Sequence, residues 1–177
     1  MKGSRRQALR WGGGVLATLA LPPAVGRARS IVEIRMQGRP DGSHVWFDPI
    51  GVRVEPGQTL RWTNLDPGNS HTSTAYHPSI ADRPLRMPED AKPWDSDYLL
   101  PNESFSATLS EPGVYDYYCQ PHEHAGMVAR IVVGRPAAAP QTASPEDPAL
   151  TPLPEVALSG FPSVEDILAQ GVVRRRA

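Results

Sequence analysis

The stretch Tyr117-Tyr118-Cys119-Gln120-Pro121-His122-Glu123-His124-Ala125-Gly126-Met127 decides how the rest of this 177-residue chain is interpreted. It holds the single cysteine of the chain, followed within eight residues by two histidines and a methionine. Thiolate, imidazole and thioether are the ligand types of sites at which copper transfers one electron. The spacing Cys-x2-His-x4-Met allows one loop to bring three such side chains to one ion. A further histidine must come from elsewhere, and His71 lies well upstream.

A β pattern fills the chain between residues 31 and 134. Short runs of alternating apolar and polar residues are separated by proline-glycine turns, and no helical period appears before residue 160. The expected strands lie near residues 31–36, 45–47, 52–54, 59–64, 104–109, 113–118 and 127–133. Residues 76–100 contain four prolines and many charges, so we expect a long loop or a short helical excursion there. The pattern predicts an all-β, antiparallel sandwich.

Three motifs occur together in this β region. They are Val52-x-Val54-x-Pro56-Gly57-Gln58-Thr59-Leu60-x-Trp62-x-Asn64, then His71, then Gly113-Val-Tyr115-x-Tyr117-Tyr118-Cys119-x-Pro121-His122-x4-Met127. Together they resemble the plastocyanin-like cupredoxins, also called type 1 or blue copper proteins. The resemblance covers residues 31–134 and implies a Greek-key β-sandwich. It also implies one copper ion bound by His71, Cys119 and His122 in a near-trigonal plane, with Met127 at a longer axial distance.

Two other histidines are alternatives to the implied ligands. His77 follows His71 by six residues, and we favour His71 because it comes after a strand and a turn, as it does in the family. His124 is the alternative to His122, which we favour because of the preceding proline and the spacing to the methionine. We expect Asn64 and the residues flanking His71 to surround the ligands. Met36 and Met87 are expected to be core or loop residues.

The first 28 residues have the features of an export signal. The sequence Ser4-Arg5-Arg6-Gln7-Ala8-Leu9 precedes a short apolar run, and small residues follow up to Ala28. The paired arginines favour the twin-arginine route. Cleavage after Ala28 removes five basic residues and no acidic residue, so the net charge falls from −1 to about −6. An acidic exported protein is a poor nucleic-acid binder, and we expect no membrane span in the mature form.

The C-terminal region has a different composition. Residues 29–134 are expected to form the cupredoxin domain, residues 135–160 a proline- and alanine-rich linker, and residues 161–177 a short amphipathic helix with a basic tail. Ser163 is the expected N-cap of this helix, with Asp166 three residues later, and Gly171 is the expected end. A helix this short is unstable alone. It therefore packs on its own domain or docks on a partner, and the sequence does not distinguish the two.

The functional prediction is an exported type 1 copper protein that carries single electrons between redox partner proteins. Pro121, Ala125 and Gly126 are expected to contribute to an apolar surface patch beside His122, through which electrons leave in the family. No nucleophile or acid–base pair accompanies the motif, so we do not expect an enzyme. The alternatives are a periplasmic protein for copper delivery or storage, and a docking subunit of a larger oxidoreductase.

Overall fold

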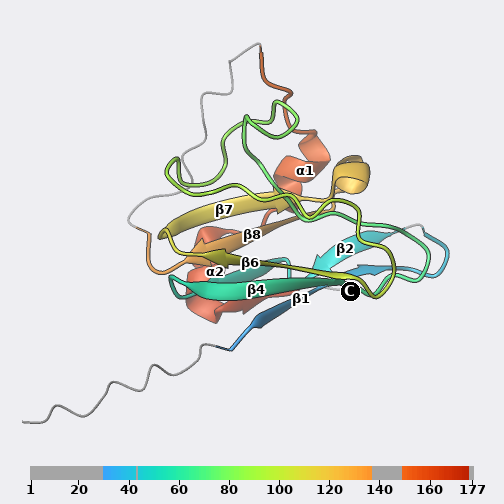
Figure 1. Cartoon of the computed structure of the whole chain (residues 1–177), viewed down its shortest axis with the longest axis horizontal. Helices are drawn as coiled ribbons and strands as arrows, with labels where there is room; N and C mark the ends of the chain where they lie inside the picture. Colours follow the sequence, from blue (N-terminus) through green and yellow to red (C-terminus); the bar gives the residue numbers. More distant parts are fainter. Residues whose placement is uncertain (1–29, 43, 137–148, 176–177) are drawn as a thin grey trace, which may run out of the picture.

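The computed structural model describes residues 30–42, 44–136 and 149–175, and it contains two β-sheets packed face to face (Figure 1). The first sheet has the order β2 (Val45–Asp48), β1 (Val32–Gly38), β4 (Gln58–Asn64) and β6 (Ser104–Leu109). The second has the order β5 (Thr74–Ala75), β7 (Gly113–Tyr118), β8 (Val128–Val133), β3 (Gly51–Val54) and β9 (Val172–Val173). The helical elements are η1 (Gln120–Ala125), α1 (Glu155–Gly160) and α2 (Val164–Gln170). The all-β sandwich expected from the sequence is confirmed.

The core lies between the two sheets and follows the alternation of the strands. In β4, Leu60 and Trp62 are fully buried while the intervening Arg61 is exposed. The Trp62 ring lies 5.6 Å from the ring of Tyr117 in β7, so aromatic packing joins the two sheets. Such pairs contribute about 0.5–1.5 kcal/mol beyond the burial of their area. Met36 and Met87, expected to be core or loop residues, are buried in this core.

Both sheets are mixed, which corrects the expectation of purely antiparallel pairing. Strand β1 pairs with β4 in parallel, and β3 pairs with β8 in parallel. Parallel neighbours cannot be joined by a tight hairpin and need a crossover connection. Here the chain leaves β1 through β2, passes into the second sheet as β3, and returns to the first sheet as β4. Periodicity identifies strands but not the direction of their neighbours, so the sequence alone missed this feature.

Residues 76–100 form a long loop, one of the two forms expected for them. No helix or strand is assigned between residues 76 and 100 of the described chain. The loop is fixed by buried side chains, because Met87 and Trp94 insert into the core. Its C-terminal end is anchored by Leu99, which forms an isolated antiparallel bridge with His71.

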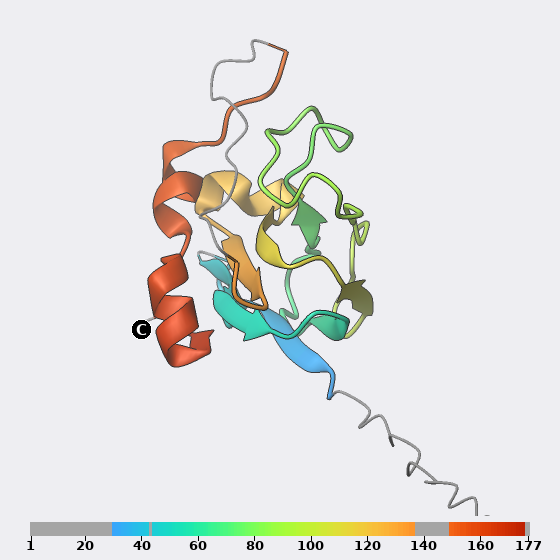
Figure 2. The same cartoon turned by 90° about the vertical axis from the view of Figure 1, so that its left-hand side faces the viewer.

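The C-terminal segment packs on the outer face of the second sheet. Figure 2 shows its two helices along one side of the sandwich. In Figure 1, α1 lies beside the golden turn of η1. Ala157 of α1 is buried against Tyr118 and Val128, and Ile167 of α2 against Val114 and Val132. All six residues of β7 are therefore buried, because the core covers one face of the strand and the tail covers the other.

The ends of α2 agree with the sequence, but the extent of the ordered tail does not. The Ser163 side chain accepts a hydrogen bond from the Asp166 N–H at 3.0 Å, and Gly171 follows the helix with a φ of 74°. However, α1 lies within the range expected to be linker, and β9 pairs with β3 beyond the expected helix. Burial of Ala157, which composition does not reveal, orders α1.

Several sequence-based expectations fall on other parts of the chain. The expected signal segment 1–28, the linker residues 137–148 and the last two residues of the basic tail lie outside the described residues. Within the described ranges, neither of the two α-helices has the length or the apolar character that a membrane crossing requires.

Candidate metal centre

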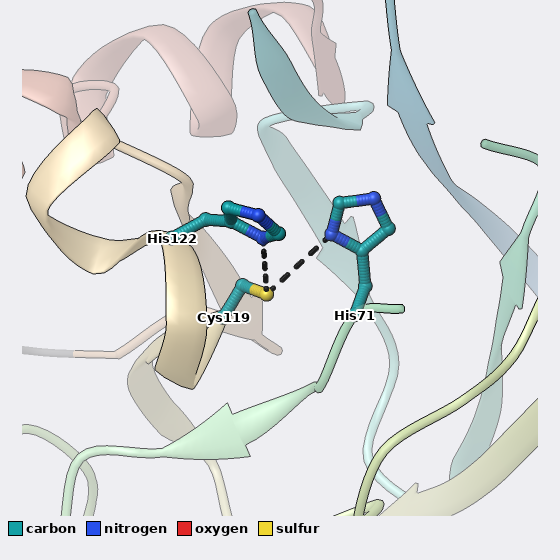
Figure 3. A group of neighbouring side chains, drawn as sticks. All are labelled: His71, Cys119 and His122. Atoms are coloured by element: carbon teal, nitrogen blue, oxygen red, sulfur yellow. Dashed lines mark hydrogen bonds between the residues drawn. The ribbon is translucent and has the colours of Figure 1, made fainter. Parts of the chain in front are cut away.

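Three potential ligand side chains from two distant parts of the chain meet at one end of the sandwich. Cys119 directly follows β7, His122 lies in η1, and His71 lies between β4 and β5. Their ligand atoms all lie within 4.8 Å of one another. The Cys119 Sγ is 3.6 Å from Nδ1 of His71 and 3.4 Å from Nδ1 of His122. Figure 3 shows both imidazole rings turned toward the sulfur.

The loop from Cys119 to Met127 is closed by its own backbone. The Cys119 N–H donates to the Met127 carbonyl at 3.0 Å, and the Met127 N–H donates to the His122 carbonyl at 3.1 Å. Pro121 lies in the first turn of η1, where no backbone N–H is needed for a hydrogen bond within the helix. Gly126 ends it with a φ of 76°, a left-handed conformation that a glycine adopts without strain. These features place Met127, which is fully buried, directly before β8 and opposite Cys119.

Thr72, the residue after His71, connects the two halves of the site. Its N–H donates to the Cys119 Sγ at 3.3 Å, and its hydroxyl accepts a hydrogen bond from the Gln120 N–H at 2.9 Å. A donor to the sulfur stabilises the thiolate and fixes its orientation. Thr72 belongs to the residues flanking His71 that the sequence analysis expected around the ligands.

His71 is held on its other side by Asp66. The Nε2 atom of His71 lies 3.0 Å from Oδ2 of Asp66, and both side chains are almost completely buried. Asn64 anchors the surrounding loop, because its amide donates to the carbonyls of Asn69 and Leu99 at 2.8 and 2.9 Å. Asn64 was expected near the ligands, whereas Asp66 was missed. The signal available for it was Asp66-x-Gly68, a spacing typical of an Asx turn.

The two alternative histidines lie elsewhere. The His77 ring interacts with Ser79, with Nδ1 2.8 Å from the serine hydroxyl oxygen. His124 follows His122 in η1 and is exposed. Neither belongs to the cluster of His71, Cys119 and His122.

The environment of the three side chains controls when they can bind a metal. Burial raises the pKa of the Cys119 thiol to about 11, although hydrogen bonds from Thr72 and His122 oppose this rise. Burial lowers the pKa of His71, partly offset by Asp66. Burial and the neighbouring His71 also lower the pKa of His122. At neutral pH the imidazoles are therefore unprotonated and available, whereas the thiol has to lose a proton to bind.

We expect the loading of Cu(II) near neutral pH to release about one proton per chain, since only the thiol is protonated beforehand. Apparent copper affinity should fall about tenfold for each unit by which the pH drops, because one proton competes for the sulfur. An indicator dye in weakly buffered protein measures the release. Cys119→Ser is the control and should release no such proton. Equal release by both proteins would show that the sulfur is not a ligand.

The donor set fits copper. A thiolate and a thioether suit Cu(I), while neutral imidazole suits both oxidation states. Three of the four side chains, His71, Cys119 and Met127, are fully buried, so access of water to them is restricted. Hard cations such as Mg²⁺ and Ca²⁺ require oxygen ligands, which this cluster does not offer.

Comparison with known proteins agrees with copper as the metal. The model of the plastocyanin/azurin family of copper-binding proteins matches residues 34–134. Chloroplastic plastocyanin of Tetradesmus obliquus is 34% identical over 94 residues, or 52% of this chain and 61% of that protein. Pseudoazurin of Paracoccus pantotrophus is 31% identical over 102 residues, or 58% of this chain and 62% of that protein. This chain thus spans about three fifths of the length of each relative.

Solved structures of similar proteins include pseudoazurin from Methylobacterium extorquens AM1. It is 27% identical in sequence and has a TM-score of 0.46, and the match covers 60% of this chain and 77% of that chain. The family match itself extends over more than half of the 177 residues, from β1 to the end of β8. The chain belongs to the plastocyanin/azurin family of copper-binding proteins, and copper is its cofactor.

Proposed function

We propose that this protein carries single electrons between redox partner proteins, with one copper ion held by His71, Cys119, His122 and Met127. The observation that carries the proposal is the convergence of two Nδ1 atoms on the Cys119 sulfur, at 3.6 and 3.4 Å. Bound copper supplies reversible one-electron chemistry by alternating between Cu(I) and Cu(II). Membership of the plastocyanin/azurin family supports the same function.

The protein's part is to hold the ligands in one arrangement. Cys119 is fixed by its backbone bond to Met127 and by the N–H of Thr72. His71 is fixed by its bridge to Leu99 and by its contact with Asp66. A binding site whose ligands are locked by packing and hydrogen bonds reorganises little when its charge changes. Fast electron exchange depends on this rigidity.

His122 is the side chain through which we expect electrons to pass. Its ring is partly exposed, whereas the other three proposed ligands are fully buried. Pro121 and Ala125, its neighbours in η1, are exposed and apolar. A partner that docks on this patch would approach the imidazole edge directly. Gly126, also expected in the patch, is buried.

An electron carrier fits these features better than the other functions considered. The buried ligands disfavour copper delivery or storage, for which an open, exchangeable site is required. The C-terminal helices cover the second sheet of their own domain, which favours a free carrier over a docking subunit. Residues 1–28 support export, by the twin-arginine route, to the periplasm.

The test is the visible spectrum and redox behaviour of the mature protein loaded with Cu(II). We expect one copper per chain, intense visible absorption from thiolate-to-copper charge transfer, and complete bleaching by a mild reductant. Reoxidation should restore the colour over repeated cycles without loss of metal. A pale spectrum, or release of copper on each reduction, would favour delivery or storage instead.

A further inference from the structure

Asp66 is a buried carboxylate with an organised set of hydrogen-bond donors. Only 1% of its surface is exposed. Oδ1 accepts from the Gly68 N–H at 2.9 Å, and Oδ2 accepts from the Asn69 amide at 2.8 Å. Oδ2 also lies 3.0 Å from Nε2 of His71. Among the described residues, these donors are a backbone N–H, an amide and an imidazole, so no cationic side chain is among the groups that hold the carboxylate.

The contact determines which nitrogen of His71 faces Cys119. A carboxylate oxygen accepts hydrogen bonds, so the Nε2 atom carries the proton and Nδ1 keeps its lone pair. Nδ1 is the atom 3.6 Å from the Cys119 sulfur. The proton on the far side of the ring thus leaves the near side free to bind a metal. His122 also directs Nδ1 toward the sulfur, and the carboxylate contact is on His71.

The chain makes room for this carboxylate in β1. A Cβ atom at Gly38 would lie 1.9 Å from Oδ2 of Asp66, so no larger residue fits without displacing the carboxylate. The backbone is fixed as well, because the Asp66 N–H donates to Oδ1 of Asn64 at 2.9 Å and the Leu65 N–H donates to the Met36 carbonyl at 2.9 Å. Two segments distant in sequence, β1 and the loop from Asn64 to His71, therefore cooperate to place one negative group behind His71.

We propose that Asp66 is a positioning residue that orients His71 for copper and favours the oxidised ion through its buried negative charge. This inference rests on the proposed copper site and deepens it. A negative charge held in a poorly screened interior stabilises Cu(II) more than Cu(I), because the interaction grows with the charge of the ion. A carboxylate hydrogen-bonded to a ligating imidazole also makes the imidazole a better donor, and removing such a partner typically costs about 10–100-fold in metal affinity.

The test is the reduction potential of Asp66→Asn, which keeps the shape of the side chain and removes its charge. Cu(II) affinity should fall about 10–100-fold and Cu(I) affinity less. Each tenfold difference between the two losses raises the midpoint potential by about 59 mV in a one-electron couple. The midpoint is measured by spectroelectrochemical titration of the visible band in the full mature chain.

Two further variants separate this role from a general effect on the fold. Glu165→Gln removes one exposed carboxylate on α2 and should leave the midpoint at the wild-type value. Gly38→Ala keeps Asp66 but forces its carboxylate away from His71, so its midpoint should rise with that of Asp66→Asn. A higher midpoint potential in both Asp66→Asn and Gly38→Ala, with the wild-type value in Glu165→Gln, supports the proposal.

Two results would overturn it. If the wild type has a reversible thiolate-to-copper band but Asp66→Asn and Glu165→Gln share its midpoint, Asp66 has no such role and the electron-carrier function still stands. If Asp66→Asn shifts the midpoint potential but Gly38→Ala keeps the wild-type value, the charge acts without orienting His71 and the positioning role is wrong. A wild-type protein without the band would refute the copper site itself.

Discussion

Cys119→Ser is expected to abolish the intense visible absorption of the copper-loaded protein entirely. The band requires a sulfur bonded to Cu(II), and the chain contains only one cysteine. Serine is close to cysteine in size, so the fully buried position next to the core remains filled. Copper binding itself should weaken strongly, because a hydroxyl is a poor substitute for a thiolate. Absorption spectroscopy and metal analysis of the purified variant measure both effects.

The histidines provide matched controls for this result. His122→Ala should also lose the band, since His122 directs its Nδ1 at the sulfur from 3.4 Å. His124→Ala changes an exposed residue two positions later and should retain full colour. His77→Ala should do the same, because that ring interacts with Ser79 instead. Loss of the band in either control would mean that the ligand set is assigned incorrectly.

Asp116→Ala is expected to lower the free energy of unfolding by about 3–5 kcal/mol. Asp116 in β7 is fully buried and accepts hydrogen bonds from Arg86 at 2.9 Å and from Arg130 at 2.7 and 3.0 Å. Removing the carboxylate leaves two guanidinium groups, each with about a tenth of its side chain exposed, without their shared counter-charge. Denaturant unfolding of the copper-free protein measures the loss.

The same change should loosen the C-terminal segment. Arg130 donates to the Pro162 carbonyl at 2.9 Å, and both arginines lie over the Phe161 ring, 5.0 and 5.2 Å from its centre. Without Asp116 these side chains lose the group that orients them. In Asp116→Ala, hydrogen exchange of the α2 amides should therefore be faster than in the wild type. Exchange of the β4 amides, which lie in the other sheet, should increase less.

An exposed ion pair is the control for the buried one. Glu33 and Arg61 form a salt bridge at 2.5 Å on the first sheet, with nearly half of each side chain exposed. Surface pairs of this kind contribute about 0–1 kcal/mol, so Glu33→Ala should be nearly neutral. If Asp116→Ala lowered the free energy of unfolding no more than Glu33→Ala, the buried network around Asp116 would not stabilise the fold as predicted.

The local pattern of residues along the chain predicted the ligand loop, the strands and the ends of α2. Cys119, His122 and Met127 lie within nine residues, so one closed loop can bring them together wherever the rest of the chain goes. The strands were predicted from alternation because each sheet has one face toward the core. The ends of α2 were predicted from Ser163 and Gly171, because capping depends on neighbours in sequence.

The packing of the tail was decided by tertiary structure. The sequence left open whether the C-terminal helix covers its own domain or a partner, since a short apolar face fits either. The signal that favours the first lies in β7, where Val114 and Tyr118 are apolar on the face opposite to Tyr115 and Tyr117. Apart from Asp116, which lies between Val114 and Tyr118, both faces of β7 are therefore apolar, as is typical of a strand covered on both.

Part of the surroundings of the proposed copper ligands was also beyond the sequence alone. The sequence already favoured His71 over His77, and the structure adds that the His71 ring faces the sulfur at 3.6 Å and that His71 is bridged to Leu99. Asp66 acts at His71 only because Gly38, 28 residues earlier, leaves space for its carboxylate in β1. The sequence by itself determined the ligand loop, whose contacts are local along the chain. Only the tertiary structure decided the space for the carboxylate behind His71, because Gly38 of β1 and the loop that carries Asp66 are brought together only by the packed strands.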